Sequence, residues 1–263
     1  DMMLLKKEER ENKTNMTAKE QIAAILKRSH ELTLRKDQVY RNLMEQIREQ
    51  GVELIRFQEL SGEESKYLER YFVNEIQPLL STMIVGKKQP FPFLKNKDIY
   101  AVAVLETRNE KEKIAIIPCN SGVFERLIAI PSRPGCFMLA EEMILHFLPK
   151  VFQKYKIVAK SLIRVTRNAD IDADSIYDED LNYRDRMAEV VKLRKKLCPV
   201  RMEMTRELDE TIVERFCEVL GLKESQVFRM DSPMDLSFLF RIQDELRSHP
   251  ELFYERRVPQ NSP

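Results

Sequence analysis

One uninterrupted helical pattern, from residue 17 to residue 50, constrains the fold of this chain more than any other stretch. The pattern opens on Thr17-Ala-Lys-Glu20, a capping box in which the threonine side chain accepts from the Glu20 amide and Glu20 reaches back to the Thr17 amide. It stops at Gly51, a residue type that favours helix C-termini. At about 1.5 Å per residue the helix is about 50 Å long, well beyond the diameter of a small domain.

The apolar side chains of this helix predict that it packs against other helices. They form one stripe with heptad spacing at its centre, made of Ile22, Ile25, Leu32, Val39, Leu43 and Ile47. A helix of this length cannot bury such a stripe alone, and residues 1–12 offer only one short apolar segment, from Met2 to Leu5. We therefore expect the helix to belong to a bundle whose other members are partly missing from this sequence or come from another chain.

Beyond the long helix, the pattern predicts a mixture of strands and helices. Residues 52–60 read as a short extended linker, and the capping box Ser61-Gly-Glu-Glu64 opens a second helix that Pro78 ends. At Ile99 the hydrophobic period changes to that of strands. The predicted strands are 99–106, 112–118, 124–131, 158–166, 199–205 and 226–230, and the helices among them are 138–152, 178–197 and 208–222.

This order of elements predicts an α+β fold. A fragment of a long-helix bundle is followed by an α+β domain with a mainly antiparallel or mixed sheet packed by helices. Residues 247–263 are polar and contain prolines, so we expect them to form an extended exit linker.

Composition narrows the classes of function. The chain has 263 residues, of which 43% are hydrophobic and 33% charged, so it can bury a core. Its 44 basic and 43 acidic residues leave a net charge of +1, so we expect no nucleic-acid partner, and any anion site must be a local basic patch. We expect no transmembrane segment and no signal peptide, a location in the cytoplasm or at the periphery of a membrane, and four reduced cysteines.

The glycines and histidines exclude several kinds of site. Only six glycines are present and the closest two are eleven residues apart, so neither a P-loop nor a G-x-G-x-x-G turn can form. The histidines His30, His146 and His249 lie far apart, and none has a second ligand at zinc-site spacing. We expect these histidines to be structural or solvated, and we assign no catalytic residue and no metal ligand.

Three stretches carry a distinctive combination of motifs. They are YFVNEIQPLLSTMIV (71–85), PFPFLKNKDIYAVAV (90–104) and IRVTRNADID (163–172). In this order and spacing they resemble the bacterial polyphosphate kinase family, and PMDLSFL (233–239) resembles a further motif of that family. The likeness covers roughly residues 20–260. Gln89 stands where many relatives have histidine and Ile163 where phenylalanine is common, and neither departure changes the expected fold.

The resemblance implies a division into parts. Residues 1–58 would be the end of a helical N-terminal domain, residues 59–258 an α+β head or middle domain, and residues 259–263 an exit linker. In the family, the phosphorylated histidine and most phosphate and magnesium ligands lie in two further C-terminal domains, and an adenine-contacting asparagine lies in a motif that falls upstream of Asp1. We therefore expect this portion to be catalytically inert, with Mg²⁺ and ATP bound in the full enzyme. As the family implies, this portion would serve dimerisation, in a homodimer or homotetramer, and would shape a substrate tunnel.

The reaction that the resemblance implies requires a basic channel. The family transfers the terminal phosphate of ATP reversibly to inorganic polyphosphate through a phosphohistidine, and the polyanion should bind in a salt-dependent way. Candidate polyphosphate-binding residues are Lys87, Lys88, Arg164 and Arg167. For Lys87 and Lys88 the alternative is a loop that only faces solvent. The two arginines are three apart on a strand and so point to opposite faces. We expect one of them to be paired with acids such as Asp170 or Asp172 and the other to face phosphate.

Two other functions remain open on the sequence. One is a free-standing module that binds anionic polymers, including RNA, although the balanced charge and the lack of clustered aromatic residues argue against it. The other is a structural assembly protein in which the helix at 17–50 makes the contact. A parent reading frame that continues for several hundred residues to a catalytic histidine would favour the kinase, and a stop codon near residue 263 would favour the alternatives.

Overall fold

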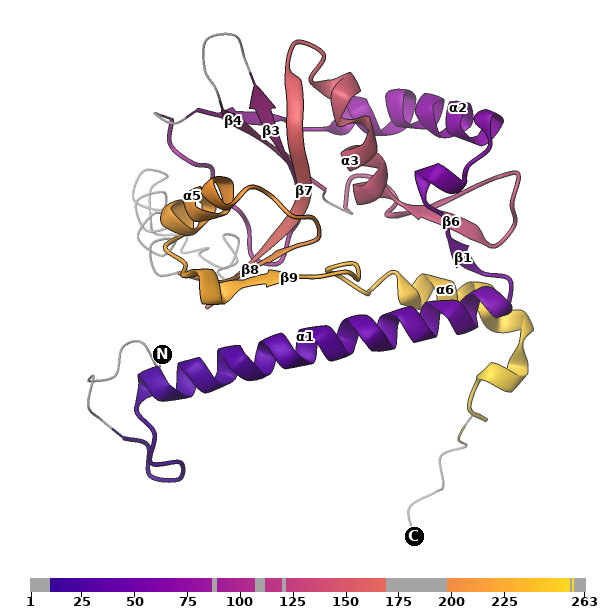
Figure 1. The fold of residues 1–263 in the computed structure, drawn as a ribbon. Coiled ribbons are helices and arrows are strands. Elements are labelled where there is room, and N and C mark those ends of the chain that lie inside the picture. Colours follow the sequence, from indigo (N-terminus) through magenta and orange to yellow (C-terminus); the bar gives the residue numbers. More distant parts are fainter. Residues whose placement is uncertain are drawn as a thin grey trace, which may run out of the picture.

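The computed structural model describes residues 10–86, 89–106, 112–119, 122–168, 198–255 and 257. It contains one long helix, a six-stranded sheet with helices on both faces and a separate three-stranded sheet, which confirms the predicted α+β class (Figure 1). The helices are α1 (Ala18–Glu49), α2 (Gly62–Tyr71), α3 (Ala140–Val151), α5 (Glu210–Leu220) and α6 (Leu239–Glu245). The strands are β1 (Glu53–Leu54), β2 (Met83–Val85), β3 (Ile99–Glu106), β4 (Lys113–Pro118), β5 (Leu127–Ala129), β6 (Cys136–Leu139), β7 (Lys156–Arg167), β8 (Pro199–Met204) and β9 (Val227–Arg229).

Helix α1 begins and ends where its local sequence predicts. The Thr17 amide donates to the Glu20 carboxylate over 2.7 Å and the Thr17 side chain accepts from the Glu20 amide, so both halves of the capping box are formed. Gly51 follows the last turn with φ of +82°, the left-handed conformation that suits glycine. In Figure 1, α1 runs beneath the rest of the molecule, with β9 above its first half and α6 beside its second half.

The apolar stripe of α1 is mostly uncovered. Ile47 is buried at the C-terminal end, whereas Ile25, Leu32, Val39 and Leu43 are between 38% and 56% exposed. The side that faces the body of the protein is instead largely polar in the middle of the helix, where Thr33 and Asp37 are buried. The stripe is therefore available for a further helix, as the sequence predicts.

The six-stranded sheet has the order β2-β4-β3-β7-β8-β9 and is antiparallel except for the parallel pair β8–β9. The predicted hairpin is present as β3 and β4. Alternate side chains of each strand point to opposite faces, so Ala101, Ala103 and Leu162 pack under α2 and α3 while Ile163 and Val165 pack under α5. Figure 1 shows α3 and α5 on opposite sides of β7.

A second sheet joins segments that the sequence analysis kept apart. Residues 52–60 are not an extended linker: β1 pairs in parallel with β6, and a 3₁₀ turn (Phe57–Glu59) follows it. The predicted strand at 124–131 is shorter and belongs to this sheet as β5. At Gly135 the backbone has φ of +79°, and a β-carbon there would lie 2.3 Å from the Gly51 carbonyl oxygen. The two chain segments can approach so closely because the residue at 135 is glycine.

The C-terminal segment folds back on the long helix. The prediction of an extended linker from residue 247 is wrong over residues 247–252, because 3₁₀ turns occupy Leu246–Ser248 and Pro250–Leu252. Proline fixes a backbone angle that also suits the first position of such a turn. Phe238 and Ile242 pack with Ile47 of α1 in a third apolar core. The predicted helix at 178–197 lies outside the described residues.

Among the helices that the structure describes, none is both long enough and apolar enough to cross a lipid bilayer.

Candidate functional site

Charged side chains gather on one face of strands β7 and β8, where α1 crosses the sheet. Arg164 of β7 lies directly opposite Glu203 of β8, and Glu203 in turn lies opposite Phe228 of β9. Arg201 is two residues before Glu203 and therefore points to the same face. We call Lys36, Arg164, Arg201 and Glu203 the charged cluster.

Glu203 is the centre of the charged cluster. Its carboxylate accepts from Arg164 Nε at 2.6 Å and lies 2.7 Å from a terminal nitrogen of Arg201. The glutamate is 2% exposed, while 19% of the Arg164 side chain and 30% of the Arg201 side chain are exposed. One buried carboxylate thus holds two guanidinium groups that remain partly accessible.

The ring of Phe228 links this cluster to α1. The His30 ring stacks on it with centroids 4.0 Å apart, and the Arg201 guanidinium lies 4.1 Å from its centroid. Two groups this close must occupy opposite faces of the ring. His30 Nε2 also donates to the Ser225 carbonyl at 3.0 Å, so the histidine is structural, as the sequence predicts.

Helix α1 contributes two charges beside the cluster. The Asp37 carboxylate accepts from the Ser232 hydroxyl at 2.5 Å and from the Asp231 amide at 3.0 Å. Burial alone would raise the pKa of Asp37, but these hydrogen bonds and Lys36 together bring it below its usual value. Burial lowers the pKa of Lys36, with Asp37 and Glu203 opposing that effect and Arg164 adding to it.

Arg167 has a different environment from Arg164. Its Nε donates to the Leu94 carbonyl at 2.9 Å, its guanidinium lies 4.1 Å from the Phe93 ring centroid, and the residue is only 9% exposed. Burial lowers the pKa of Arg167. Arg167 therefore holds the PFPFL segment in place, and these contacts with Leu94 and Phe93 do not involve Arg164.

The remaining residues of the predicted site cannot be placed. Lys87 and Lys88 lie outside the described residues, as do Asp170 and Asp172, the acids expected to pair with the arginines. The pairing that the structure shows for Arg164 is instead with Glu203, 39 residues further along the chain.

Two further ion pairs anchor other segments of the fold. Arg126 donates to Glu141 at 2.7 Å and to the Asp235 carbonyl at 2.7 Å, and so fixes the PMDLSFL segment. Glu64, at the start of α2, accepts from the Ser132 hydroxyl at 2.6 Å and from Arg133 Nε at 2.8 Å. The hydrogen bonds from Ser132 and from the amide of Ser61, with Arg133, lower the pKa of Glu64 to about 2.

The other two histidines also have local partners. His146 stacks on Phe57 with ring centroids 3.6 Å apart, and burial, with a smaller effect of Lys160, lowers its pKa. His249 Nδ1 lies 3.2 Å from the Glu251 carboxylate. Within the described ranges, no group of three or more histidine, cysteine, aspartate or glutamate side chains is placed to hold a metal ion.

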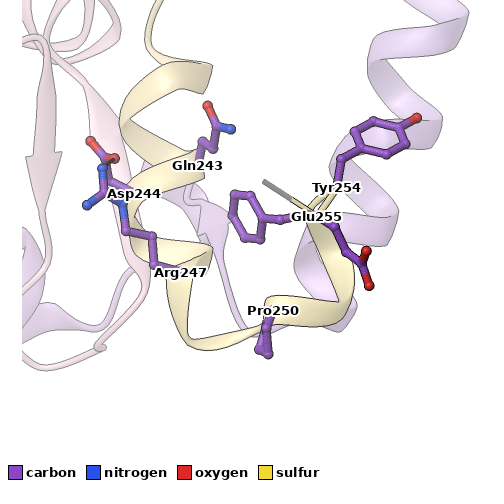
Figure 2. A pocket seen from close by; sticks show the side chains of 7 residues that line it. Gln243, Asp244, Arg247, Pro250, Tyr254 and Glu255 are labelled. Carbon is purple, nitrogen blue, oxygen red and sulfur yellow. Dashed lines mark hydrogen bonds and ion pairs between the residues drawn. The ribbon is translucent and has the colours of Figure 1, made fainter. Parts of the chain in front are cut away.

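A surface hollow of about 690 Å³ lies at the C-terminal end, between α6 and residues 253–255 (Figure 2). Its one arginine, Arg247, already donates to Asp244 at 2.6 Å, and Glu255 adds a second negative charge. This balance of charges does not suit a polyanion. No residue predicted from the sequence to bind polyphosphate lines the hollow.

The sequence analysis missed Lys36, Arg201 and Glu203. A signal was present in PVRMEMT, residues 199–205, where Arg201 and Glu203 alternate with buried apolar residues on a predicted strand. That alternation places both charges on one face. It could not reveal that Arg164 lies opposite, because the register of two strands so far apart in sequence is set by tertiary packing.

Comparisons with known proteins agree with the fold. A family model described as the polyphosphate kinase middle domain matches residues 63–242. A polyphosphate kinase of Halalkalibacterium halodurans is 33% identical over 95% of this chain and 36% of its own length, and one of Bacillus anthracis is 32% identical over 95% and 37%. The crystal structure of polyphosphate kinase from Porphyromonas gingivalis matches with a TM-score of 0.64 at 19% identity, over 91% of this chain and 35% of that chain, and it supports the fold alone.

These matches converge on one class of protein, the bacterial kinases. Within that class, the chain belongs to the polyphosphate kinase family, whose middle domain model covers residues 63–242. The chain spans about a third of the length of the curated relatives it matches.

Proposed function

We propose that this chain is the non-catalytic middle portion of a polyphosphate kinase. The complete enzyme would transfer the terminal phosphate of ATP reversibly to inorganic polyphosphate through a phosphohistidine, with Mg²⁺. The observation that supports a non-catalytic role most directly is that His30, His146 and His249 each hold a structural or local contact. Among the described residues no group of three or more histidine, cysteine, aspartate or glutamate side chains is placed to hold a metal ion, and we assign no magnesium-dependent step to them.

Labelled ATP tests this role. The purified chain is incubated with ATP labelled in the terminal phosphate, Mg²⁺ and polyphosphate, and acid-labile histidine phosphate is measured. The complete Halalkalibacterium halodurans kinase serves as the positive control. We expect no label on the chain, because a histidine that attacks phosphate needs cations around the transferred group, and the direct contacts of these three are with aromatic rings, a carbonyl and a carboxylate. Stoichiometric label on any of its three histidines would refute the inert role.

The second part of the proposal is that this portion contributes to oligomerisation. Its support is the exposed stripe of Ile25, Leu32 and Val39 on α1, which has the spacing of a helix–helix contact. In the complete protein this stripe would be covered by a helix of the same or a partner subunit. Light scattering of the complete protein measures the mass of the oligomer. The variant Leu32→Glu is compared with the control Lys27→Glu on the same helix. Equal mass and equal stability of the two variants would contradict the assignment.

The third part is that the domain shapes a path for polyphosphate. We propose the boundaries 1–58, 59–258 and 259–263 for the helical portion, the middle domain and the exit linker. Of the four residues predicted to line that path, Arg164 is partly exposed beside two other cations, which supports its role. Lys87 and Lys88 remain candidates from sequence, while the contacts of Arg167 with Leu94 and Phe93 favour a structural role for it.

A further inference from the structure

Three cations of the charged cluster share few negative charges. Glu203 lies between Arg164 and Arg201, and Lys36 lies near enough for its charge to be affected by both Glu203 and Arg164. Two other carboxylates lie nearby. Asp37 accepts from the Ser232 hydroxyl and from backbone amides, and Asp235, which is affected by the charge of Arg164, pairs with Arg126 at 3.3 Å. Of the three carboxylates near these cations, Asp37 and Asp235 have other partners, and only Glu203 pairs directly with both Arg164 and Arg201.

The donors of these cations are poorly satisfied. Lys36 Nζ lies 3.5 Å from Asp37 Oδ1 and 3.9 Å from the Met230 sulfur, although an ammonium has three hydrogens to donate. Arg201 Nε is buried and has no hydrogen-bond partner among the described residues. Leaving half-buried charged donors without acceptors is costly, and an anion with several oxygens would remove that cost.

The aromatic residue at the cluster does not favour a nucleobase. Phe228 has His30 on one face and Arg201 on the other, so neither face is open for base stacking. Proteins that bind single-stranded nucleic acid depend on such open aromatic faces. The chemistry of the cluster therefore fits phosphate groups without bases.

We propose that Lys36, Arg164 and Arg201 form a docking site for condensed phosphate, and specifically for a segment of an inorganic polyphosphate chain. This inference rests on the proposed function, because it assigns the polymeric substrate of that function to one face of the middle domain. The exposed parts of the three side chains, between 19% and 32%, give the phosphate access. Burial lowers the pKa of Lys36 and of Arg201, Glu203 opposes this effect at both residues, and the positive charge of Arg164 adds a smaller lowering.

Equilibrium binding to end-labelled polyphosphate, measured on the whole chain at several salt concentrations, tests the site. We expect Lys36→Met and Arg201→Gln each to weaken binding about tenfold and to lower the slope of log affinity against log salt by about one. The matched control is Lys27→Met, because Lys27 is an exposed lysine of the same helix without a partner contact in the described structure. The control should change the affinity less than about twofold.

Several outcomes would overturn the inference. Lys36→Met and Lys27→Met could have equal effects in variants with unchanged circular dichroism, or the chain could fail to bind polyphosphate at any salt concentration. If Arg201→Gln fails to fold, Lys36→Met and its conservative counterpart Lys36→Arg decide the matter, since Lys36→Arg should retain binding. Competition by ATP as strong as by polyphosphate of equal phosphate content would assign the site to a nucleoside triphosphate instead. The proposed function is tested separately by the activity of a hybrid polyphosphate kinase that carries residues 63–242 of this chain, so that either idea can fail alone.

Discussion

Replacing Glu203 by glutamine removes the charge that Arg164 and Arg201 share while keeping the shape of the side chain. The carboxylate is almost fully buried, with contacts of 2.6 and 2.7 Å to the two guanidinium groups. Removing one partner of a buried ion pair costs about 3–5 kcal/mol, because the remaining charge stays desolvated. The two arginines are 19% and 30% exposed and the amide oxygen still accepts one hydrogen bond, so we expect a loss near the lower limit, about 3 kcal/mol.

Urea denaturation followed by circular dichroism measures this loss. The midpoint should fall while the slope of the unfolding free energy against urea stays unchanged, because the substitution does not change how much surface unfolding exposes. The matched control is Glu106→Gln, since Glu106 pairs with Lys156 at 2.9 Å but the two side chains are 44% and 74% exposed. Exposed pairs contribute less than about 1 kcal/mol. A loss for Glu203→Gln below about 1 kcal/mol, or equal to that of the control, would refute the reasoning.

Polyphosphate should change the result for the same variant. Without the Glu203 carboxylate, the three cations repel one another more and attract an anion more strongly. We expect polyphosphate to raise the unfolding midpoint of Glu203→Gln by more than that of the unaltered protein. Equal shifts of the two midpoints would show that the ion pairs of Glu203 stabilise the fold without affecting polyphosphate binding.

Three further predictions follow from single contacts. Gly135→Ala should lose at least about 2 kcal/mol through its left-handed backbone and its clash with the Gly51 carbonyl, whereas Gly62→Ala, which meets nothing within 4 Å, should be nearly neutral in the same urea titration. The pKa of Glu64 is about 2 when folded and about 4.3 when unfolded, so the stability that its carboxylate contributes is complete above the unfolded value and is lost as pH falls toward 2. The difference in melting temperature between wild type and Glu64→Gln should therefore shrink over that pH window, and a constant difference would contradict this. Asp37→Asn should cost about 2 kcal/mol and speed hydrogen exchange at the two backbone amides that donate to Asp37, and unchanged protection there would show that the carboxylate does not hold this turn.

The sequence predicted the elements that local interactions determine. The limits of α1 follow from a capping box and a glycine, both of which act within a few residues of the helix ends. The β3–β4 hairpin follows from two strand-period segments around a short polar turn. In each case the information lies in neighbouring residues, which is why the pattern is sufficient.

Features that depend on distant pairing could not be predicted in this way. The strand β1 is two residues long and forms only because β6, more than 80 residues later, lies beside it. The segment from residue 247 looks polar, yet its Phe253 packs against the apolar core that contains Ile47 of α1. The order of the elements predicted the fold class, and neither that order nor the resemblance to a family revealed these contacts.

The candidate site likewise combines residues that the sequence could indicate with contacts that only distant pairing determines. Arg164 was singled out because an arginine is unusual within an apolar strand, and the structure gives it a carboxylate partner and a partly exposed position. Arg167 stood out for the same reason, but its partner is a backbone carbonyl, which no sequence pattern reveals. Lys36 could not be associated with either arginine, because its place depends on how α1 crosses the sheet.

A hybrid enzyme tests the central claim most directly. Residues 63–242 replace the corresponding middle domain in the polyphosphate kinase of Halalkalibacterium halodurans, and polyphosphate synthesis from ATP is measured against the unaltered enzyme. If this chain supplies a non-catalytic middle domain, the hybrid should make polyphosphate at a rate within about tenfold of its parent and should carry label on a histidine outside the exchanged segment. A folded hybrid that makes no polyphosphate, or that is labelled within residues 63–242, would contradict the account.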